Sequence, residues 1–191
     1  MKAAKSDPVR LKIRKLENAM MKQKAELARL RRKAKLEPVA DFALQTTEGK
    51  VVKLSSLFGK KNELILVHNM GSSCPYCTLW ADGFNGLLPH LQDRAAFVIE
   101  SPEAPKSVAA FRKKRGWKFP MVSSKGSPFR KGMGYQDASG DVAPGVSTFV
   151  KKGGKLYRVS DTGFGPGDNF CPAWDFFDLL PKKDWEAKFR Y

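Results

Sequence analysis

An uninterrupted apolar run that leads through a cysteine pair into an apolar helix constrains the fold of this chain most. The run, Leu64–Val67, shows no alternation with polar residues, which is typical of a strand buried on both faces of a sheet. Cys74-Pro75-Tyr76-Cys77 comes next, and Pro75 suits the first turn of a helix. Apolar residues then recur at helical spacing: Leu79, Trp80, Phe84, Leu87, Leu88 and Leu91. The two cysteines therefore fall at the turn from a buried strand into a helix.

The other segments continue this alternation of strands and helices. The expected elements, in chain order, are a hairpin turning at Glu48-Gly49, a turn of helix at 55–58, a strand at 96–99, a helix over 105–115, a strand at 119–122, a hairpin turning at Gly153-Gly154 and a helix over 172–180. Residues 124–145 are rich in Gly, Ser and Pro and predict a long loop. The order predicts an α/β fold in which helices cover a central sheet whose last strands are antiparallel.

The first 37 residues form a basic segment with an apolar seam of its own. They hold thirteen of the 35 Lys and Arg residues and four acidic ones, a charge of +9 out of +16 for the whole chain. We expect one helix over 8–36, ended by Pro38, with Gln23 in the one polar place of its seam. The seam residues follow steps of four and three: Val9, Ile13, Leu16, Met20, Leu27, Leu30 and Ala34. The sequence thus predicts a basic amphipathic helical extension at 1–37 and an α/β domain at 38–191.

The basic helix allows three interpretations. Its near-heptad seam could join a second copy as a coiled coil and form a homodimer, or it could lie across the chain's own domain. A basic helix could also meet nucleic acid or an anionic membrane. No aromatic residue stands among the basic positions to stack on bases, so we do not expect nucleic acid as a partner.

Length and composition limit the class of protein and its compartment. A chain of 191 residues suits one domain with an appendage. No apolar run reaches the ~18 residues that a membrane span needs, and the first residues lack the apolar stretch of a secretory signal. We therefore expect a cytoplasmic protein that does not enter the membrane. In such a reducing compartment, a Cys-x-x-Cys pair is redox-active or metal-binding rather than structural.

The start of a helix is a place where cysteine chemistry is physically favoured. Free backbone N–H groups and the helix dipole stabilise a thiolate there and lower its pKa below the usual ~8.5. Cys74 is therefore the expected nucleophile of a thiol–disulfide oxidoreductase, and Cys77 is its resolving thiol. Cys74 would form a mixed disulfide with a disulfide substrate, Cys77 would displace the substrate, and a cellular thiol reductant would reopen the Cys74–Cys77 bridge. This cycle uses neither a metal nor an organic cofactor.

Zinc binding and an inert place in the core are the alternatives for the pair. Cys-x-x-Cys is half of a zinc site, which Cys171 with His68 or His90 could complete. Zinc pairs usually lie on tight hairpins, and this pair does not, so we expect no metal. Each histidine is expected to pack or to form local hydrogen bonds. Cys171 is expected to be a half-buried structural thiol at the start of the last helix, with a role as third redox partner as the alternative.

Several motifs resemble known families. The order of elements, with Cys74–Cys77 at the first strand-to-helix turn, resembles the thioredoxin fold over about 39–181. The tetrapeptide is the one that glutaredoxins carry, whereas the lead-in over 41–57 and Phe119-Pro120 resemble the peroxiredoxin-related branch. Longer stretches are similar to a bacterial thioredoxin-like family of unknown function: 73–91 and 116–127. The resemblance implies a thioredoxin fold behind the N-terminal helical extension, and it implies little about the substrate.

The chain departs from these families at positions that bear on function. Thioredoxins and glutaredoxins place a cis-proline just before the strand that faces the cysteines. We expect that place to fall on Val146 or Ser147, with Pro144 a few residues early. Peroxiredoxins carry a Pro and a Thr seven and three residues before the reactive cysteine, where this chain has Val67 and Gly71. The second departure weakens a standard peroxidase interpretation.

Two further hypotheses stand beside the oxidoreductase. One is a thiol-dependent peroxidase in which Cys74 becomes a sulfenic acid that Cys77 resolves. The other is a catalytically idle thioredoxin-like scaffold that binds its partner through the basic helix.

Overall fold

The structure, a computed structural model, describes residues 7–181 and divides after Lys35 into two compact units. The first unit contains one helix, α1 (Pro8–Lys33). It begins where expected, because the carboxylate of Asp7 accepts a hydrogen bond from the backbone N–H of Val9 (2.9 Å) and Pro8 occupies the first turn. It ends three residues before the expected position, and Pro38 does not end it but lies in the first strand.

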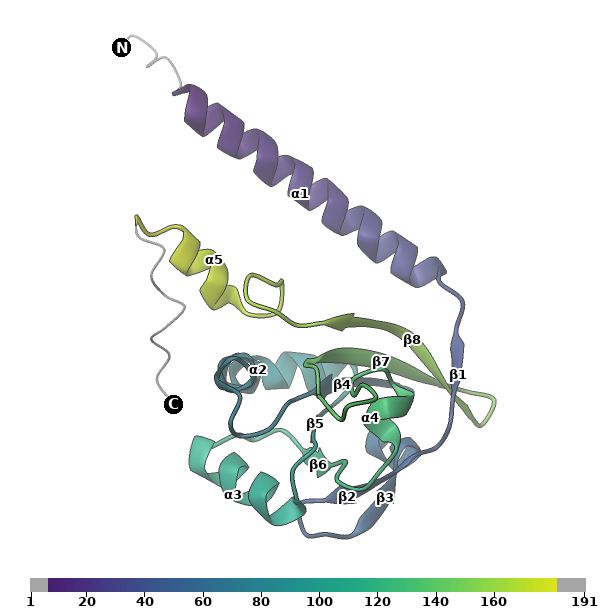
Figure 1. Cartoon of the computed structure of the whole chain (residues 1–191). Helices are drawn as coiled ribbons and strands as arrows, with labels where there is room; N and C mark the ends of the chain where they lie inside the picture. The colour runs from purple at the N-terminus through teal and green to yellow at the C-terminus, as the bar shows by residue number, and fades with distance from the viewer. Residues whose placement is uncertain (1–6, 182–191) are drawn as a thin grey trace. The chain divides into compact units, whose positions relative to one another are not determined.

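The second unit is built on one mixed sheet, which has eight strands within the described residues (Figure 1). Its order is β1-β8-β7-β4-β5-β6-β2-β3. The bounds are β1 (Glu37–Val39), β2 (Ala43–Thr46), β3 (Val51–Lys53), β4 (Glu63–His68), β5 (Ala96–Ser101), β6 (Met121–Ser123), β7 (Gly145–Lys152) and β8 (Lys155–Gly163). The central strands β4, β5 and β6 are parallel, and β7 and β8 are antiparallel additions, as the sequence predicts.

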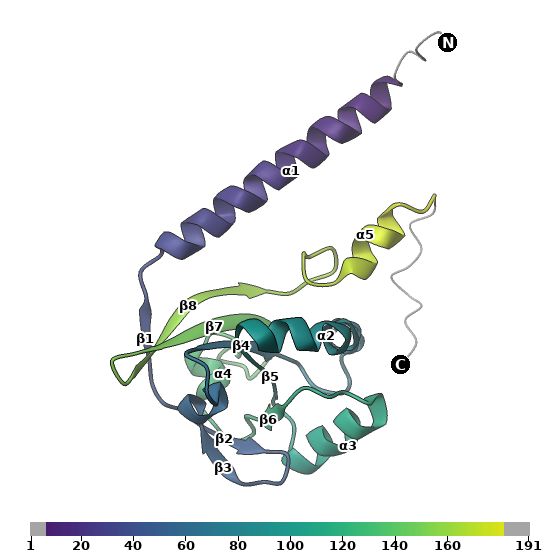
Figure 2. The same ribbon diagram turned by 180° about the vertical axis from the view of Figure 1, so that it is seen from behind.

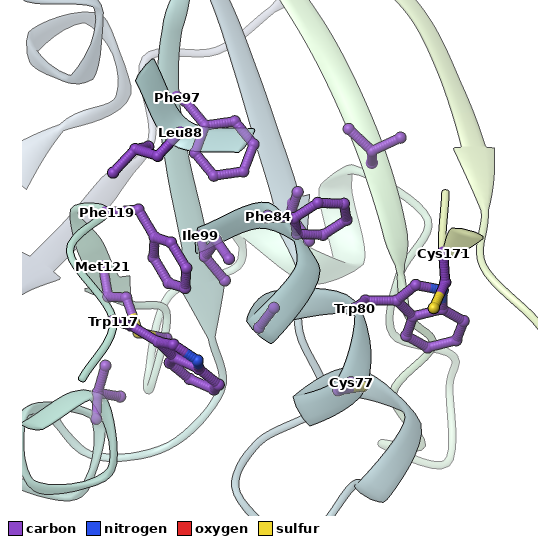
Figure 3. Packing of buried hydrophobic residues seen from close by; sticks show 14 of the residues in the cluster. Cys77, Trp80, Phe84, Leu88, Phe97, Ile99, Trp117, Phe119, Met121 and Cys171 are labelled. Atoms are coloured by element: carbon purple, nitrogen blue, oxygen red, sulfur yellow. The ribbon is translucent and has the colours of Figure 1, made fainter. Parts of the chain in front are cut away.

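Helices cover both faces of this sheet (Figure 2). Side chains alternate along β5, so Phe97 and Ile99 pack on one face while Val98 packs on the other. The first face is covered by α2 (Pro75–Arg94), α3 (Pro105–Arg115) and α5 (Pro172–Asp178). The second is covered by the 3₁₀ helix η1 (Leu54–Phe58) and by the short α4 (Phe129–Gly132). Figure 3 shows the aromatic and aliphatic side chains that α2 contributes to the first core.

Two elements were not predicted from the sequence. The short strand β1 pairs with β8, and its Glu37 forms an ion pair with Arg158 (2.6 Å), a partner more than a hundred residues away. The helix α4 lies inside the segment 124–145, which was expected to be a loop throughout, because Phe129 buries its side chain completely. No helix within residues 7–181 has both the length and the apolar character needed to cross a membrane.

Candidate active site

Cys74 and Cys77 lie at the first turn of α2, after the loop that follows the central strand β4. Cys74 is the residue that caps the helix: its Sγ accepts a hydrogen bond from the backbone N–H of Cys77 (3.1 Å). The Cys74 side chain is half-buried, whereas Cys77 is only 2% exposed. The Sγ of Cys77 accepts a hydrogen bond from the backbone N–H of Met70 (3.4 Å), which fixes it on the inner side of the turn. One sulfur therefore faces the surface and the other faces the core.

The two thiols differ strongly in acidity. A hydrogen bond from the Cys77 thiol, together with the backbone N–H groups of Cys77 and Tyr76, lowers the pKa of Cys74 to about 7 despite its partial burial. The hydrogen bond that Cys77 donates to Cys74, together with burial, raises the pKa of Cys77. Near neutral pH, Cys74 is therefore a thiolate in a large fraction of molecules while Cys77 keeps its proton.

The loop between β4 and α2 is held in place by the side chain of its own first residue, Asn69, and by a side chain from the segment after β5. The carboxylate of Glu103 accepts hydrogen bonds from the backbone N–H of Ser72 (3.1 Å) and from its hydroxyl (2.6 Å). The side-chain oxygen of Asn69 accepts one from the backbone N–H of Gly71 (2.7 Å). Gly71 has a φ of +108° and approaches Glu103 closely, so a side chain there would be strained. These contacts position the cysteine pair before any substrate binds.

A buried polar cluster lies beneath this loop, on the sheet face opposite α2. His68 and Glu100 are fully buried, with His68 Nδ1 3.3 Å from a carboxylate oxygen of Glu100 and Nε2 2.9 Å from the hydroxyl of Ser147. Arg130, 2% exposed, donates to Glu100 (2.9 Å) and to the backbone carbonyl of Asn69 (2.8 Å). Burial lowers the pKa of His68. The cluster thus anchors the start of the active loop through Asn69.

An aromatic wall and a small cavity border the cysteines on the α2 side. Tyr76 and Trp80 of α2 meet Trp174 of α5 at ring-centroid distances of 6.0 and 6.2 Å. The cavity, about 10 Å³, has room for one water molecule, and its lining includes Cys77 and Pro144. Cys77 therefore borders a small pocket whose lining is mostly apolar but includes His68 and Asn69.

The position of Pro144 corrects the sequence-based expectation. Strand β7, which lies beside β4, begins at Gly145, so Pro144 is the residue directly before it. Val146 and Ser147, where the equivalent of the thioredoxin proline was expected, are already paired with β4 inside the strand. All peptide bonds within residues 7–181 are trans.

Comparison with known proteins identifies the family. A family model described as "Bacterial protein of unknown function (DUF899)" matches residues 9–188, nearly the whole chain. The chain belongs to the DUF899 family. No curated protein matches it.

Solved structures similar to this DUF899 protein share its fold. The peroxidoxin BcpB of Mycobacterium tuberculosis is 24% identical, over 67% of this chain and 84% of that chain, with a TM-score of 0.55. A mutant of PrxQ from Xylella fastidiosa is 19% identical over 74% and 90%, with a TM-score of 0.57. The bacterioferritin comigratory protein of Xanthomonas campestris is 22% identical over 75% and 93%, with a TM-score of 0.52. The α/β domain therefore has the thioredoxin fold, as the sequence motifs imply.

The remaining predicted site residues are dispersed in the DUF899 structure. Cys171 occupies the position before α5 without a side-chain capping hydrogen bond and is 4% exposed, so it is more deeply buried than expected, and its burial raises its pKa. His90 lies exposed on α2, and His68 belongs to the buried cluster, where its hydrogen-bond partners are the distant residues Glu100 and Ser147. Within the described part of the chain, no three His, Cys, Asp or Glu side chains come together as metal ligands. The structure therefore does not bring Cys171 or either histidine to the cysteine pair as a ligand set.

The difference in acidity predicts a selective reaction with iodoacetamide. Because only the thiolate reacts, the rate at Cys74 should be half-maximal at about pH 7, fall about tenfold per pH unit below that, and level off above it. Cys77 and Cys171, whose pKa values are raised, should react much more slowly at neutral pH. Mass spectrometry of digested samples, taken over time at several pH values, measures all three sites. Equal rates at the three cysteines would contradict the described electrostatics.

Proposed function

We propose that this DUF899 protein is a thiol–disulfide oxidoreductase in which Cys74 attacks a substrate disulfide and Cys77 resolves the product. One observation supports it above all: a half-buried thiol with a pKa of about 7 caps α2 and is hydrogen-bonded to a buried thiol that holds its proton. A nucleophile and a resolving thiol need this inequality, because only the first must be ionised when the substrate arrives. The residues beside it, Ser72, Ser73 and Pro75, are exposed, so a disulfide can approach its Sγ.

The cycle balances without a cofactor. The Cys74 thiolate attacks one sulfur of the substrate, the substrate disulfide breaks, and the other half leaves as a thiolate that takes up a proton. Cys77 then loses its proton to solvent and attacks Cys74 Sγ, which releases the second half of the substrate and forms the Cys74–Cys77 disulfide. The substrate gains two electrons and two protons in total. A thiol reductant of a reducing compartment such as the cytoplasm returns the pair to the dithiol.

A peroxidase is the second candidate, and the same thiolate favours it. In that reaction Cys74 attacks the terminal oxygen of a hydroperoxide, an alcohol leaves, and the sulfenic acid condenses with Cys77 to give a disulfide and water. Alkyl peroxide reduction is an activity of the bacterioferritin comigratory protein of Xanthomonas campestris, whose fold this chain shares. The positions seven and three residues before Cys74 hold Val67 and Gly71, which do not match the peroxiredoxin pattern. We therefore place disulfide reduction first.

The rates of oxidation by two different substrates distinguish the two reactions. The reduced protein is mixed separately with a small aromatic disulfide and with tert-butyl hydroperoxide, and formation of the Cys74–Cys77 disulfide is followed in each case. We expect the disulfide to be consumed faster at equal concentration, with turnover when a monothiol or dithiol reductant is present. Faster oxidation by the hydroperoxide would favour the peroxidase. Reaction with neither substrate would favour an idle scaffold and contradict the proposal.

A further inference from the structure

Helix α1 presents an apolar seam that its own helix cannot bury. The large seam side chains are 44% to 64% exposed: Val9, Ile13, Leu16, Met20, Leu27 and Leu30. Removing each from water is worth about 1.5–3 kcal/mol when burial is complete, so the seam favours a partner surface. The chemistry of that partner follows from the residues that flank the seam.

We propose that α1 pairs with α1 of a second copy as a parallel, in-register, two-stranded coiled coil. The seam fits a heptad repeat abcdefg in which Ile13, Met20 and Leu27 occupy the a positions. The d positions hold Val9, Leu16, Gln23 and Leu30. Three of these four d residues are apolar, and the layers continue over most of the 26-residue helix.

The flanking charges favour the parallel arrangement. In a parallel coiled coil, a g residue of one helix faces the e residue five positions later on the other. This rule places Lys12 opposite Glu17 of the second copy, and Glu26 opposite Arg31 of the second copy. The third pair is neutral on one side, because Ala19 faces Lys24. Glu26 already forms an ion pair with Arg29 of its own helix (2.5 Å), so Lys12 and Glu17 are the better test of the pairing.

An antiparallel pair of the same length would bring like charges together. There e faces e and g faces g, so Arg10 would lie opposite Arg31 and Lys12 opposite Lys33. By symmetry, each of these two repulsive contacts would occur twice. Only one kind of attractive contact would offset them. The charge pattern is therefore complementary in the parallel pair and not in the antiparallel pair of full length.

The polar seam residue favours the same register. In the parallel pair, the two Gln23 side chains meet each other, and each amide can donate to and accept from the other. In the antiparallel pair, Gln23 would lie against Met20, which cannot satisfy a buried amide. A polar residue at one seam position is a known means of fixing register and the number of strands.

Mass in solution tests the dimer directly. Sedimentation equilibrium of the full-length, reduced protein should give twice the 21.3 kDa of one chain. Leu16→Asp places a charge in a d layer of both helices and should weaken association at least about a hundredfold. Leu11→Asp is the matched control, since Leu11 is also exposed (51%) but lies at an f position outside the seam. The dissociation constant of its dimer should be within about threefold of that of the unaltered protein. A monomeric full-length protein, or equal effects of the two substitutions, would overturn the proposal.

Charge reversal and cross-linking test the orientation. Glu17→Lys turns two attractive contacts into repulsive ones and should weaken the dimer by about tenfold, and adding Lys12→Glu should restore it. Leu30→Cys, in a chain whose native cysteines are replaced by serine, should form a disulfide between copies on mild oxidation. In the antiparallel pair the two positions would be about 25 Å apart. A dimer that neither responds to the charge swap nor cross-links at position 30 would contradict the parallel register.

Discussion

Replacing Cys74 with serine should abolish reduction of a disulfide substrate, with a rate loss of about a thousandfold or more. A serine hydroxyl is not ionised near neutral pH, so the group that the α2 N-terminus stabilises as an anion is lost. The fold should survive, because a serine oxygen can also cap a helix by accepting from the backbone N–H of residue 77. Substrate reduction is followed by absorbance, and the fold by circular dichroism.

Replacing Cys77 with serine should have a different effect from replacing Cys74. The Cys77→Ser protein should still attack the substrate once, but it should stop as a mixed disulfide on Cys74 that mass spectrometry can identify. Cys171→Ser is the matched control, because Cys171 is buried and lies at the start of a different helix, and it should leave turnover nearly unchanged. Loss of turnover in Cys171→Ser would instead make that residue a third redox partner. A mixed disulfide on Cys77 in the Cys74→Ser protein would contradict the assigned order of attack.

Removing the charge of Arg130 should destabilise the protein by about 3–5 kcal/mol. Arg130→Met leaves the carboxylate of Glu100 buried without its charged partner, and it also removes the hydrogen bond to the carbonyl of Asn69. Urea unfolding followed by tryptophan fluorescence measures the loss. Because the cluster supports the loop before Cys74, disulfide reduction should also slow in this variant.

A surface pair provides the control for this stability prediction. Arg94 and Glu63 also form an ion pair, but their side chains are 71% and 46% exposed, so Arg94→Met should cost less than about 1 kcal/mol. Adding Glu100→Gln to Arg130→Met should recover part of the loss, because it removes the unpaired buried charge. If the two arginine substitutions cost the same, Arg130 does not compensate a buried charge as described.

The sequence was sufficient to predict the elements whose residues carry a local pattern. The apolar runs at β4 and β5, the periodic helix α2 and the Gly153-Gly154 turn all lie within one or two residues of their expected places. The position of the cysteine pair at a helix start also follows from local signals alone, since Pro75 occupies the first turn. These features depend on neighbours in the chain.

Features that depend on distant residues could not be predicted in the same way. Arg130 lies in a segment without periodicity, and its partner Glu100 stands after the apolar run 96–99, within β5, so nothing local shows that the two meet in the core. The only signal was a charged residue directly after a buried run, where an unpaired charge would be costly. The aromatic wall also depends on distant residues, because Trp174 of the last described helix contacts Tyr76. Its aromatic composition was visible in the sequence, but its contact with the cysteine helix was not.

The redox titration of Cys74 and Cys77 tests the central claim most directly. The protein is equilibrated in glutathione or dithiothreitol buffers of defined potential, free thiols are alkylated, and the dithiol and disulfide forms are counted by mass spectrometry. We predict one two-electron transition confined to Cys74 and Cys77, at a potential between about −180 and −270 mV, where working thiol–disulfide oxidoreductases lie. A pair that forms no disulfide even in the most oxidising buffer, or one whose disulfide persists below about −300 mV as structural bridges do, would contradict it.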